Sequence, residues 1–349
     1  MNSPRVGVVV LNCNGLGELI PCLESLRRST YRPLEICVVD NASTDGSPER
    51  VAADFPEVNL IRSPVNLGWS RGNNRGIRHL LDKGIDYIWI INNDVEIDPD
   101  CVSRLVELCE DRPDVGVCGP LIYYWEPRDR VWFAGGYVDF DRLEAGHCST
   151  VDEFRSLPAT RRYISGCAMF VRREVFERVG LIDERFFIYC EDADFGLRAG
   201  RAGFGIEVVP EAAMFHKVSA FSGGEGAQSP FQAFQLLRST MLFWRKHLGW
   251  WGFHRRWCAG HLGKWVNDIP YAWEDPSRRE RARAIIDAVW YVLSGQRNPL
   301  ERPSAPQWFV RLMRRRPWLV AELMALRLPA VQPLIRRRPG VADNAPDGN

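Results

Sequence analysis

Short apolar runs alternate with segments of helical spacing through the first third of the chain. Runs rich in Val, Ile and Leu occupy residues 6–11, 34–39 and 87–91, and apolar positions three and four apart mark residues 16–28. Such runs predict strands buried on both faces, and their alternation with helices predicts an α/β fold with a mainly parallel sheet flanked by helices. The other elements expected here are a strand at 59–63, helices at 47–55 and 72–81, and a helix after Asp98-Pro99-Asp100, which predicts an acidic cap with proline in the first turn.

The pattern is less regular in the middle of the chain. Aromatic pairs and glycines over 121–165 predict loops and edge strands with exposed aromatic faces. Residues 166–180 predict a strand and a helix ending at Gly180, and 191–202 predicts a helix whose first turn is acidic, as the helix dipole favours. Two further features are a short strand end at Val208-Val209-Pro210 and a glycine-rich hinge or mobile loop at 222–226.

Charge and aromatic content divide the chain near residue 230. Residues 1–230 carry 25 Lys and Arg against 35 Asp and Glu, a net charge of −10. Residues 231–349 carry 20 against 9, a net charge of +11, and hold nine of the 13 Trp. Two regions with different partners are therefore expected. The expected divisions are a catalytic domain over 1–228, a basic helical region over 229–337 and a disordered tail over 338–349.

Neither the N-terminus nor the ten cysteines indicates export. No basic segment followed by a cleavable apolar stretch opens the chain, and no apolar run approaches the ~18 residues that a membrane span needs. The cysteines are scattered without C-x-x-C pairs, which predicts reduced thiols rather than disulfides or a zinc site. We expect a cytoplasmic protein that can attach to the inner face of the cell membrane.

Polar clusters follow three of the predicted strands, at Asn12–Asn14, Asp40–Asp45 and Asn92–Asp94. Because ligands of open α/β sheets bind beyond the carboxyl ends of the strands, these clusters should meet at one edge. Asp94 offers a carboxylate that suits Mg²⁺ or Mn²⁺ beside bound phosphates, although Asn and Asp also favour turns. Asp40 suits a base N–H or a ribose hydroxyl, or bonds its own turn.

An acidic cluster, Glu191-Asp192-Ala193-Asp194, opens one predicted helix. Asp194 lies four residues before Arg198, a spacing that predicts an ion pair. Glu191 and Asp192 are then left as candidates for a general base that removes a proton from an acceptor hydroxyl, with helix capping as the alternative. Further along, His216 is either a metal ligand or a packed histidine.

Residues 66–76 form the densest unusual stretch, with glycines interleaved among asparagines and arginines. The glycines permit close backbone approach to a ligand, and Arg71 or Arg75 suits a phosphate. The spacing matches neither the dinucleotide fingerprint nor the P-loop, so neither of those sites is supported.

Taken in order, these segments resemble a family 2 glycosyltransferase of the GT-A fold, in particular its rhamnosyltransferase-like and galactofuranosyltransferase-like members. The resemblance covers about residues 5–245. It rests on the strand and turn 8–14, the nucleotide-binding segment 38–47, the stretch 66–76, Asn92-Asn93-Asp94 at the place of the D-x-D metal motif, and the catalytic segment 186–198 with His216 beyond it.

The resemblance implies an inverting transfer of a sugar from a dTDP- or UDP-linked donor to a hydroxyl of a glycan or polyprenyl-linked acceptor in cell-surface polysaccharide synthesis. It implies Asp192 as the base, with Glu191 as the second candidate, and Mn²⁺ or Mg²⁺ held by Asp94 and His216. The donor-binding residues that it implies are Asn12, Asn14, Asp40, Asn66, Gly68, Arg71, Asn74 and Asn93.

Two positions depart from the family pattern. Asn92 replaces the first Asp of D-x-D, which leaves Asp94 as the charged ligand, and Cys13 replaces an aromatic residue that often stacks near the base. Asn92 keeps open a second hypothesis, a non-catalytic membrane-associated scaffold on a degenerate transferase fold. A sugar nucleotidyltransferase is disfavoured because residues 12–17 lack the Arg or Lys of a basic phosphate loop.

The basic region interleaves Trp with Arg and Lys, most densely over 244–257 and 314–318. This composition suits the surface of an anionic membrane, where Trp lies at headgroup level. Helices packed on the catalytic domain with a solvated basic face are an equal alternative. Nucleic acid is not expected as a partner, because no known module is recognised and the rest of the chain is acidic.

Overall fold

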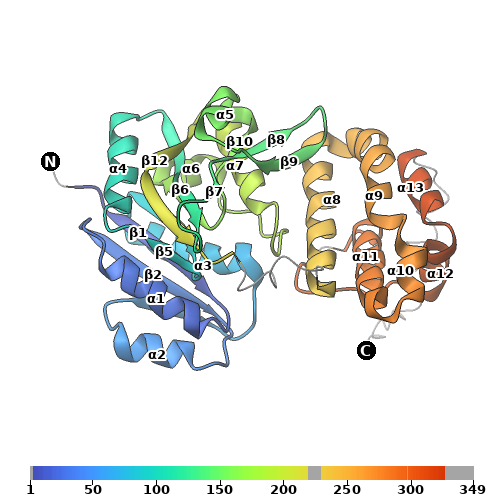
Figure 1. The fold of residues 1–349 in the computed structure, drawn as a ribbon, viewed down its shortest axis with the longest axis horizontal. Coiled ribbons are helices and arrows are strands. Elements are labelled where there is room, and N and C mark those ends of the chain that lie inside the picture. Colours follow the sequence, from blue (N-terminus) through green and yellow to red (C-terminus); the bar gives the residue numbers. More distant parts are fainter. Residues whose placement is uncertain (1–2, 219–228, 297, 327–349) are drawn as a thin grey trace, which may run out of the picture. The chain divides into compact units, whose positions relative to one another are not determined.

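The chain divides into two compact units, Met1–Ala227 and Gln228–Asn349 (Figure 1). The computed structural model describes residues 3–218, 229–296 and 298–326. The glycine-rich loop expected at 222–226 and the tail expected at 338–349 lie outside these residues.

A nine-stranded mixed sheet runs through the first unit in the order β3-β2-β1-β4-β11-β6-β12-β5, and β7 pairs with β6. Pairing is parallel from β3 to β4 and between β6 and β12, whereas β11 is inserted antiparallel between β4 and β6. The strands are β1 (Val6–Asn12), β2 (Leu34–Asn41), β3 (Asn59–Ser63), β4 (Tyr87–Asn92), β5 (Val95–Ile97), β6 (Val115–Tyr124), β7 (Val131–Phe133), β11 (Ala168–Arg172) and β12 (Gly205–His216).

A smaller sheet and seven helices complete this unit (Figure 1). The small antiparallel sheet has the order β10-β8-β9 and consists of β8 (Gly136–Asp139), β9 (Glu144–His147) and β10 (Arg162–Tyr163). The helices are α1 (Leu16–Arg27), α2 (Ser47–Asp54), α3 (Gly68–Asp82), α4 (Cys101–Asp111), α5 (Val151–Ser156), α6 (Arg173–Val179) and α7 (Glu191–Arg201), with a short 3₁₀ turn at Ala159–Arg161.

The alternation predicted for the first hundred residues is confirmed element by element. Val8 and Val10 of β1, and Ile88 and Ile90 of β4, are all completely buried, because the central strands are covered on both faces. The start of α4 differs from the prediction. The helix begins at Cys101, so its proline precedes the first turn, and the Asp98 side chain accepts a hydrogen bond from the Asp100 N–H (3.0 Å) within the preceding turn.

The middle of the chain holds more regular structure than its sequence predicts. β12 is 12 residues long and contains Pro210, where a short strand end was expected. Its register against β6 shifts between Val209 and Ala213, and such an irregularity tolerates a residue without an N–H. The expectation of exposed aromatic faces over 121–165 is wrong for Phe133, which is completely buried, whereas Trp132 keeps a partly exposed ring.

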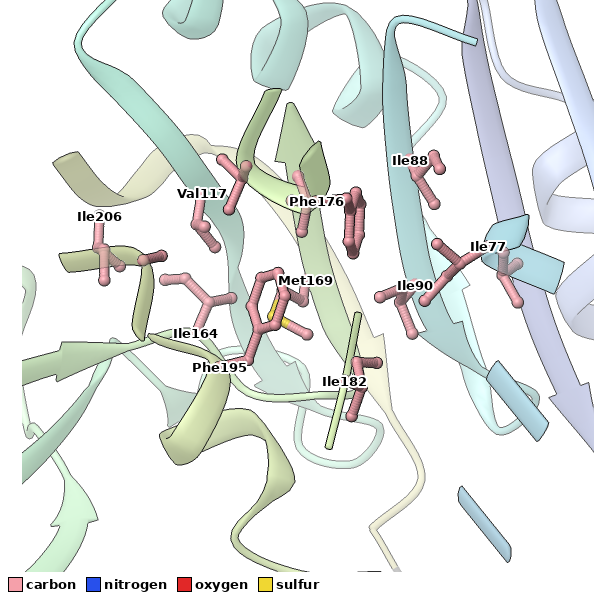
Figure 2. Close-up of a cluster of buried hydrophobic side chains, with 14 of the residues drawn as sticks. Ile77, Ile88, Ile90, Val117, Ile164, Met169, Phe176, Ile182, Phe195 and Ile206 are labelled. Carbon is pink, nitrogen blue, oxygen red and sulfur yellow. The ribbon is translucent and has the colours of Figure 1, made fainter. Parts of the chain in front are cut away.

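The core of this unit packs the sheet against α3, α6 and α7. Figure 2 shows Ile88 and Ile90 of β4 and Met169 of β11 among Phe176 of α6 and Phe195 of α7. Phe195 is completely buried. Burial of such a side chain contributes about 1.5–3 kcal/mol, so the core holds α7 firmly against the sheet.

The described residues of the second unit form helices and the connections between them, as predicted. Its first helix begins with a capping box in which Ser229 and Gln232 bond each other's backbone N–H groups. Buried Asp287 accepts hydrogen bonds from Arg283 and Arg302 (3.0 Å each). The helices are α8 (Pro230–Gly252), a π-helical segment Phe253–Leu262, α9 (Gly263–Val266), α10 (Ile269–Glu274), α11 (Pro276–Ser294), α12 (Gln307–Arg315) and α13 (Pro317–Leu326).

All ten cysteines lie within the described residues. All ten cysteines are free thiols, and eight of them are buried. Among the described helices, none combines the length and the apolar character that crossing a bilayer requires.

Candidate active site

The three polar clusters meet at one edge of the sheet, as predicted. Parallel pairing places Asn12, at the end of β1, opposite Asp40 of β2. The Asn12 side-chain amide donates to Ser47 Oγ (2.8 Å) and Ser43 Oγ (3.1 Å), and its Oδ1 accepts from Asn93 Nδ2 (2.8 Å). Asn12 is therefore the centre of a polar network that joins the ends of β1, β2 and β4.

The turn after β2 is held by side-chain bonds to its backbone. Asp40 is buried, and its Oδ2 accepts from the Ser43 N–H (3.2 Å). Asn14 has a positive φ of 52°, and its Oδ1 accepts from the Thr44 N–H (2.7 Å). These bonds hold the backbone of the turn beside the exposed Asn14.

The stretch 66–76 is folded by contacts with the segment that precedes α7. Asn66 accepts hydrogen bonds from the Gly68 N–H (2.8 Å) and Asn41 Nδ2 (3.0 Å). Gly68 has φ +78°, and a Cβ on it would lie 2.6 Å from the Phe187 ring. The Trp69 N–H donates to the Phe187 carbonyl (2.6 Å). Phe187 is thus the residue that closely approaches the backbone of Gly68.

Two residues of the same stretch are engaged within the protein. Asn74 is completely buried, donating to the Ile182 carbonyl (2.8 Å) and accepting from the Ile182 N–H (3.2 Å). The structure does not bring Asn74 to the sheet edge with the other predicted donor-binding residues. Arg71 lies 3.5 Å from a carboxylate oxygen of Glu184 and keeps about a third of its side chain exposed.

A carboxylate and an imidazole face each other at the same edge. Asp94 follows β4, and His216 ends β12, whose pairing with β5 sets His216 opposite Val95. Asp94 Oδ1 and His216 Nε2 are 3.2 Å apart, and both residues are 6% exposed. Among the described residues, buried Asp94 Oδ1 makes no hydrogen bond of good geometry, although His216 Nε2 lies 3.2 Å from it. A cation held by the two groups would compensate the buried carboxylate.

The Asp94–His216 pair fits a divalent cation. Carboxylate oxygen and imidazole nitrogen are ligands for Mn²⁺, and Mg²⁺ is usually held by one or two carboxylates with phosphates and water. Cis ligands at about 2.1 Å from an octahedral ion lie about 3.0 Å from each other, close to the observed 3.2 Å. Across the described ranges, no cluster of three or more His, Cys, Asp and Glu side chains is arranged for a metal. The other ligands would come from a bound diphosphate and water.

The three carboxyl groups of the α7 acidic cluster have different surroundings. Asp194 pairs with Arg198 (2.9 Å), as the spacing predicts. Glu191 is only 5% exposed, and its buried Oε2 has no hydrogen-bond partner among the described residues. Asp192 is half-buried and accepts hydrogen bonds from the N–H groups of Gly166 (3.1 Å) and Ala193 (2.8 Å). Of the two unpaired acids, Asp192 is the one that a substrate can reach.

Burial shifts the acidity of both remaining carboxyl groups. It raises the pKa of Glu191 well above its usual range, and the negative charge of Asp192 raises it further. Burial also raises the pKa of Asp192, while the two N–H donors partly oppose this rise. Burial thus raises the pKa of Glu191 more strongly than that of Asp192, whose carboxylate accepts from two N–H donors.

Backbone strain is concentrated immediately before these acids. Tyr189 and Cys190 have φ values of 72° and 67°, in the left-handed region that residues other than glycine rarely adopt. Each such residue costs about 1–3 kcal/mol, and strain of this kind clusters at functional sites. The strained pair directs the start of α7 so that Asp192 meets Gly166.

Several residues of the site escape prediction from the sequence. Trp69 Nε1 donates to Asn92 Oδ1 (3.3 Å), and Gly166 supports Asp192 through its N–H. Trp132 packs its ring against those of His216 and His147. No local signal marks these residues, because their roles depend on contacts between strands far apart in the sequence.

The sequence matches known glycosyl transferases. The family described as "Glycosyl transferase family 2" matches residues 7–180. An N-acetylglucosaminyl-diphospho-decaprenol L-rhamnosyltransferase of Mycobacterium tuberculosis is 32% identical over 259 residues, which cover 67% of this chain and 82% of that protein. The dTDP-rhamnosyl transferase RfbF of Shigella flexneri is 26% identical over 255 residues, covering 71% and 82%.

The fold also matches a solved transferase structure. A mannosyltransferase from Pyrobaculum calidifontis in complex with GDP-Man and Mn²⁺ aligns with a TM-score of 0.52 at 17% identity, covering 93% of this chain and 88% of that one. This similarity supports the GT-A fold. The sequence matches favour an enzyme over the non-catalytic scaffold that Asn92 kept open.

Proposed function

We propose that this chain, which belongs to glycosyl transferase family 2 and is a glycosyltransferase, inverts the anomeric centre of a dTDP- or UDP-linked sugar as it transfers that sugar to an acceptor hydroxyl. Its relatives include rhamnosyltransferases of cell-surface polysaccharide synthesis. One relative's name specifies a dTDP-linked rhamnosyl group and another's a decaprenol diphosphate-linked N-acetylglucosamine. We take a rhamnosyl donor and a polyprenyl-linked acceptor as the leading candidates for this chain.

The nucleoside half of the donor would lie along the ends of β1 and β2. Asn14 and the backbone of the turn after Asp40 are available there, and Asn12 and Asn93 hold that edge in shape. Asn66 and Gly68 shape the neighbouring wall, with Arg71 at its exposed side. Asn74 supports the wall from behind through its bonds to Ile182.

The diphosphate would lie beside Asp94 and His216, which would hold Mn²⁺ or Mg²⁺. A bound divalent cation supplies Lewis acidity that stabilises charge on the departing diphosphate. The Asp94 carboxylate and the neutral imidazole of His216 contribute a fixed, desolvated pair of ligands, so little rearrangement is needed when the donor binds.

In the proposed transfer step, Asp192 acts as the base. The acceptor oxygen forms a bond to the anomeric carbon while the bond from that carbon to the diphosphate oxygen breaks. The bonding pair leaves with the nucleoside diphosphate, and the acceptor proton moves to Asp192. A positioned base of this kind contributes typically 10²–10⁴-fold to the rate. Glu191, buried and with a more strongly raised pKa, remains the second candidate.

The second unit would bring the enzyme to a membrane-resident acceptor. Trp308, Arg311 and Arg315 share one face of α12, and all three are exposed. Trp318 of α13 is 50% exposed. Exposed tryptophans beside arginines suit an anionic bilayer surface, where each Arg adds about 1 kcal/mol of attraction. We propose nucleotide sugars as the donors, and we place this membrane attachment on the cytoplasmic side.

One observation carries the proposal: the buried Asp94–His216 pair lies at the same strand edge as the Asn12 network. Its test is thermal unfolding of the full chain with UDP, dTDP, GDP or CDP, each with and without Mn²⁺ or Mg²⁺. A ligand at 100 times its dissociation constant adds about 2.7 kcal/mol of stability. We expect stabilisation by one nucleotide that depends on the metal, and loss of this dependence in Asp94→Ala.

Two outcomes would count against this function. Absence of stabilisation by all four nucleotides would remove the donor site. Stabilisation whose metal dependence persists in Asp94→Ala would remove Asp94 from the metal pair while leaving the nucleotide site in place.

A further inference from the structure

An indole ring lies between two histidines at the proposed site. The Trp132 ring centroid is 4.6 Å from that of His216 and 5.3 Å from that of His147, and both imidazoles stand nearly perpendicular to it (73° and 77°). Trp132 is on β7 and His147 ends β9, so two strands of different sheets supply the rings. Trp132 is partly exposed, which leaves some of the indole available to a ligand.

The two rings are carried by a fixed framework. His147 pairs with Gly136 across β9 and β8, and the Tyr163 hydroxyl donates to the Gly146 carbonyl (3.2 Å). Phe133, next to Trp132, is completely buried and packs edge-on against His147 at 4.9 Å. Sites built on strands in this way hold side chains more accurately than loops do.

His147 connects this ring pair to the surroundings of the proposed base. It pairs with Gly136 of β8, Gly136 pairs with Tyr163 of β10, and Gly166, three residues after Tyr163, donates its N–H to Asp192 (3.1 Å). His147 is exposed, so its imidazole is accessible for a hydrogen bond with a ligand. The rings thus extend from the metal pair, through Trp132, to the small sheet beside the segment that holds Asp192.

We infer that Trp132 and His147 form the binding subsite for the acceptor's sugar ring. The indole packs against the apolar C–H face of a pyranose, and His147 bonds a hydroxyl of the same ring, which turns the attacking hydroxyl toward Asp192. The inference rests on the proposed function, because it needs Asp192 as the base.

Position favours the acceptor over the donor's nucleoside as the occupant. The proposed nucleoside edge is built from β1, β2 and the turn after Asp40, and neither β7 nor β9 contributes to it. The attacking hydroxyl must come within hydrogen-bond reach of Asp192. The ring that bears this hydroxyl therefore lies near Gly166, which bonds Asp192 and follows β10 of the small sheet that carries His147.

The test compares His147→Ala and Trp132→Leu with wild type, using a synthetic lipid diphosphate of N-acetylglucosamine and simple pyranosides as acceptors. We expect KM for the acceptor to rise about five- to tenfold in each variant, since stacked aromatic contacts contribute on this scale. Metal-dependent stabilisation by the nucleotide should stay unchanged in His147→Ala. His147→Gln, which keeps a hydrogen-bonding group, should recover part of the loss.

Trp125→Leu is the matched control. This tryptophan follows β6 and packs against Arg128 and Lys217 rather than between the histidines. An equal rise in KM in Trp125→Leu, or an unchanged KM in His147→Ala, would overturn the subsite. Weaker metal-dependent nucleotide binding in Trp132→Leu would instead show that Trp132 supports His216. It would overturn the assignment of Trp132 to the acceptor subsite. Failure of the wild type to transfer to any acceptor would overturn the proposed function itself.

Discussion

Two adjacent carboxyl groups on α7 have different surroundings, and this difference assigns them different chemistry. Asp192 is half-buried and supported by two N–H donors, whereas Glu191 is buried with one oxygen unpartnered among the described residues. The residue types and their adjacency are evident from the sequence. Their difference is not, because it depends on Gly166, which the fold brings from 26 residues away.

We expect Glu191→Gln to flatten the pH dependence of stability. The folded-state pKa of Glu191 is raised, so the folded chain binds more protons than the unfolded chain between the two pKa values. The contribution of Glu191 to the free energy of unfolding is therefore fully present below its pKa in the unfolded chain, about 4.3. It falls as the pH rises toward the folded-state pKa, by up to about 1.4 kcal/mol per pH unit. The neutral, isosteric glutamine removes this term.

Thermal unfolding of both proteins between about pH 5 and 8 measures the effect. Glu191→Gln should melt higher than wild type toward neutral pH. The exposed Glu174, substituted in the same way, is the control and should follow wild type. An unaltered slope in Glu191→Gln would show that this carboxyl ionises in the folded protein as easily as in the unfolded chain.

At the scale of elements, the central strands and their helices were predictable, and the edge structures were not. Buried parallel strands require continuous apolar runs, so β1, β2 and β4 are evident in the sequence. β12 contains Pro210 at a register shift, and β7, β8 and β9 are strands of only three or four residues. For such elements, packing rather than local pattern decides the structure.

The start of α3 offers a test of how the site wall is built. We expect Gly68→Ala to destabilise the protein by about 1–3 kcal/mol, because it places a Cβ on a residue with φ +78° and against Phe187. Gly17→Ala in α1 is the control, since nothing lies within 4 Å of its Cβ position, and alanine there should be neutral or stabilising. Chemical denaturation measures both. Equal stability of the two variants would contradict the described contact between α3 and Phe187.

At the scale of the whole molecule, the charge asymmetry of the sequence corresponds to two compact units with different surfaces. The basic helical unit exposes Trp251 (59%) and Trp318 (50%). The sequence could not decide between a membrane-facing and a solvated basic surface, because both need the same composition. The exposed tryptophans on the described helices favour the membrane-facing surface.

Vesicle binding tests this proposal. We expect the full chain to sediment with vesicles that contain phosphatidylglycerol and to remain in solution with pure phosphatidylcholine. Reversing two charges on α12, with Arg311→Glu and Arg315→Glu together, should weaken binding at least about tenfold, since each Arg contributes about 1 kcal/mol. Arg142→Glu, an exposed arginine of the other unit, should bind as wild type. Undiminished binding by the double variant would exclude this face as the contact.

The most direct measurement of the catalytic proposal is sugar transfer by wild type, Asp192→Asn and Glu191→Gln. Each would receive a dTDP- or UDP-linked sugar, Mn²⁺ and a lipid diphosphate of N-acetylglucosamine, with product mass and nucleoside diphosphate release as readouts. We expect transfer by wild type, and a loss of about 10²–10⁴-fold in turnover in Asp192→Asn with nucleotide binding nearly unchanged. Full turnover in Asp192→Asn, with the loss found in Glu191→Gln instead, would contradict the assignment of Asp192 as the base.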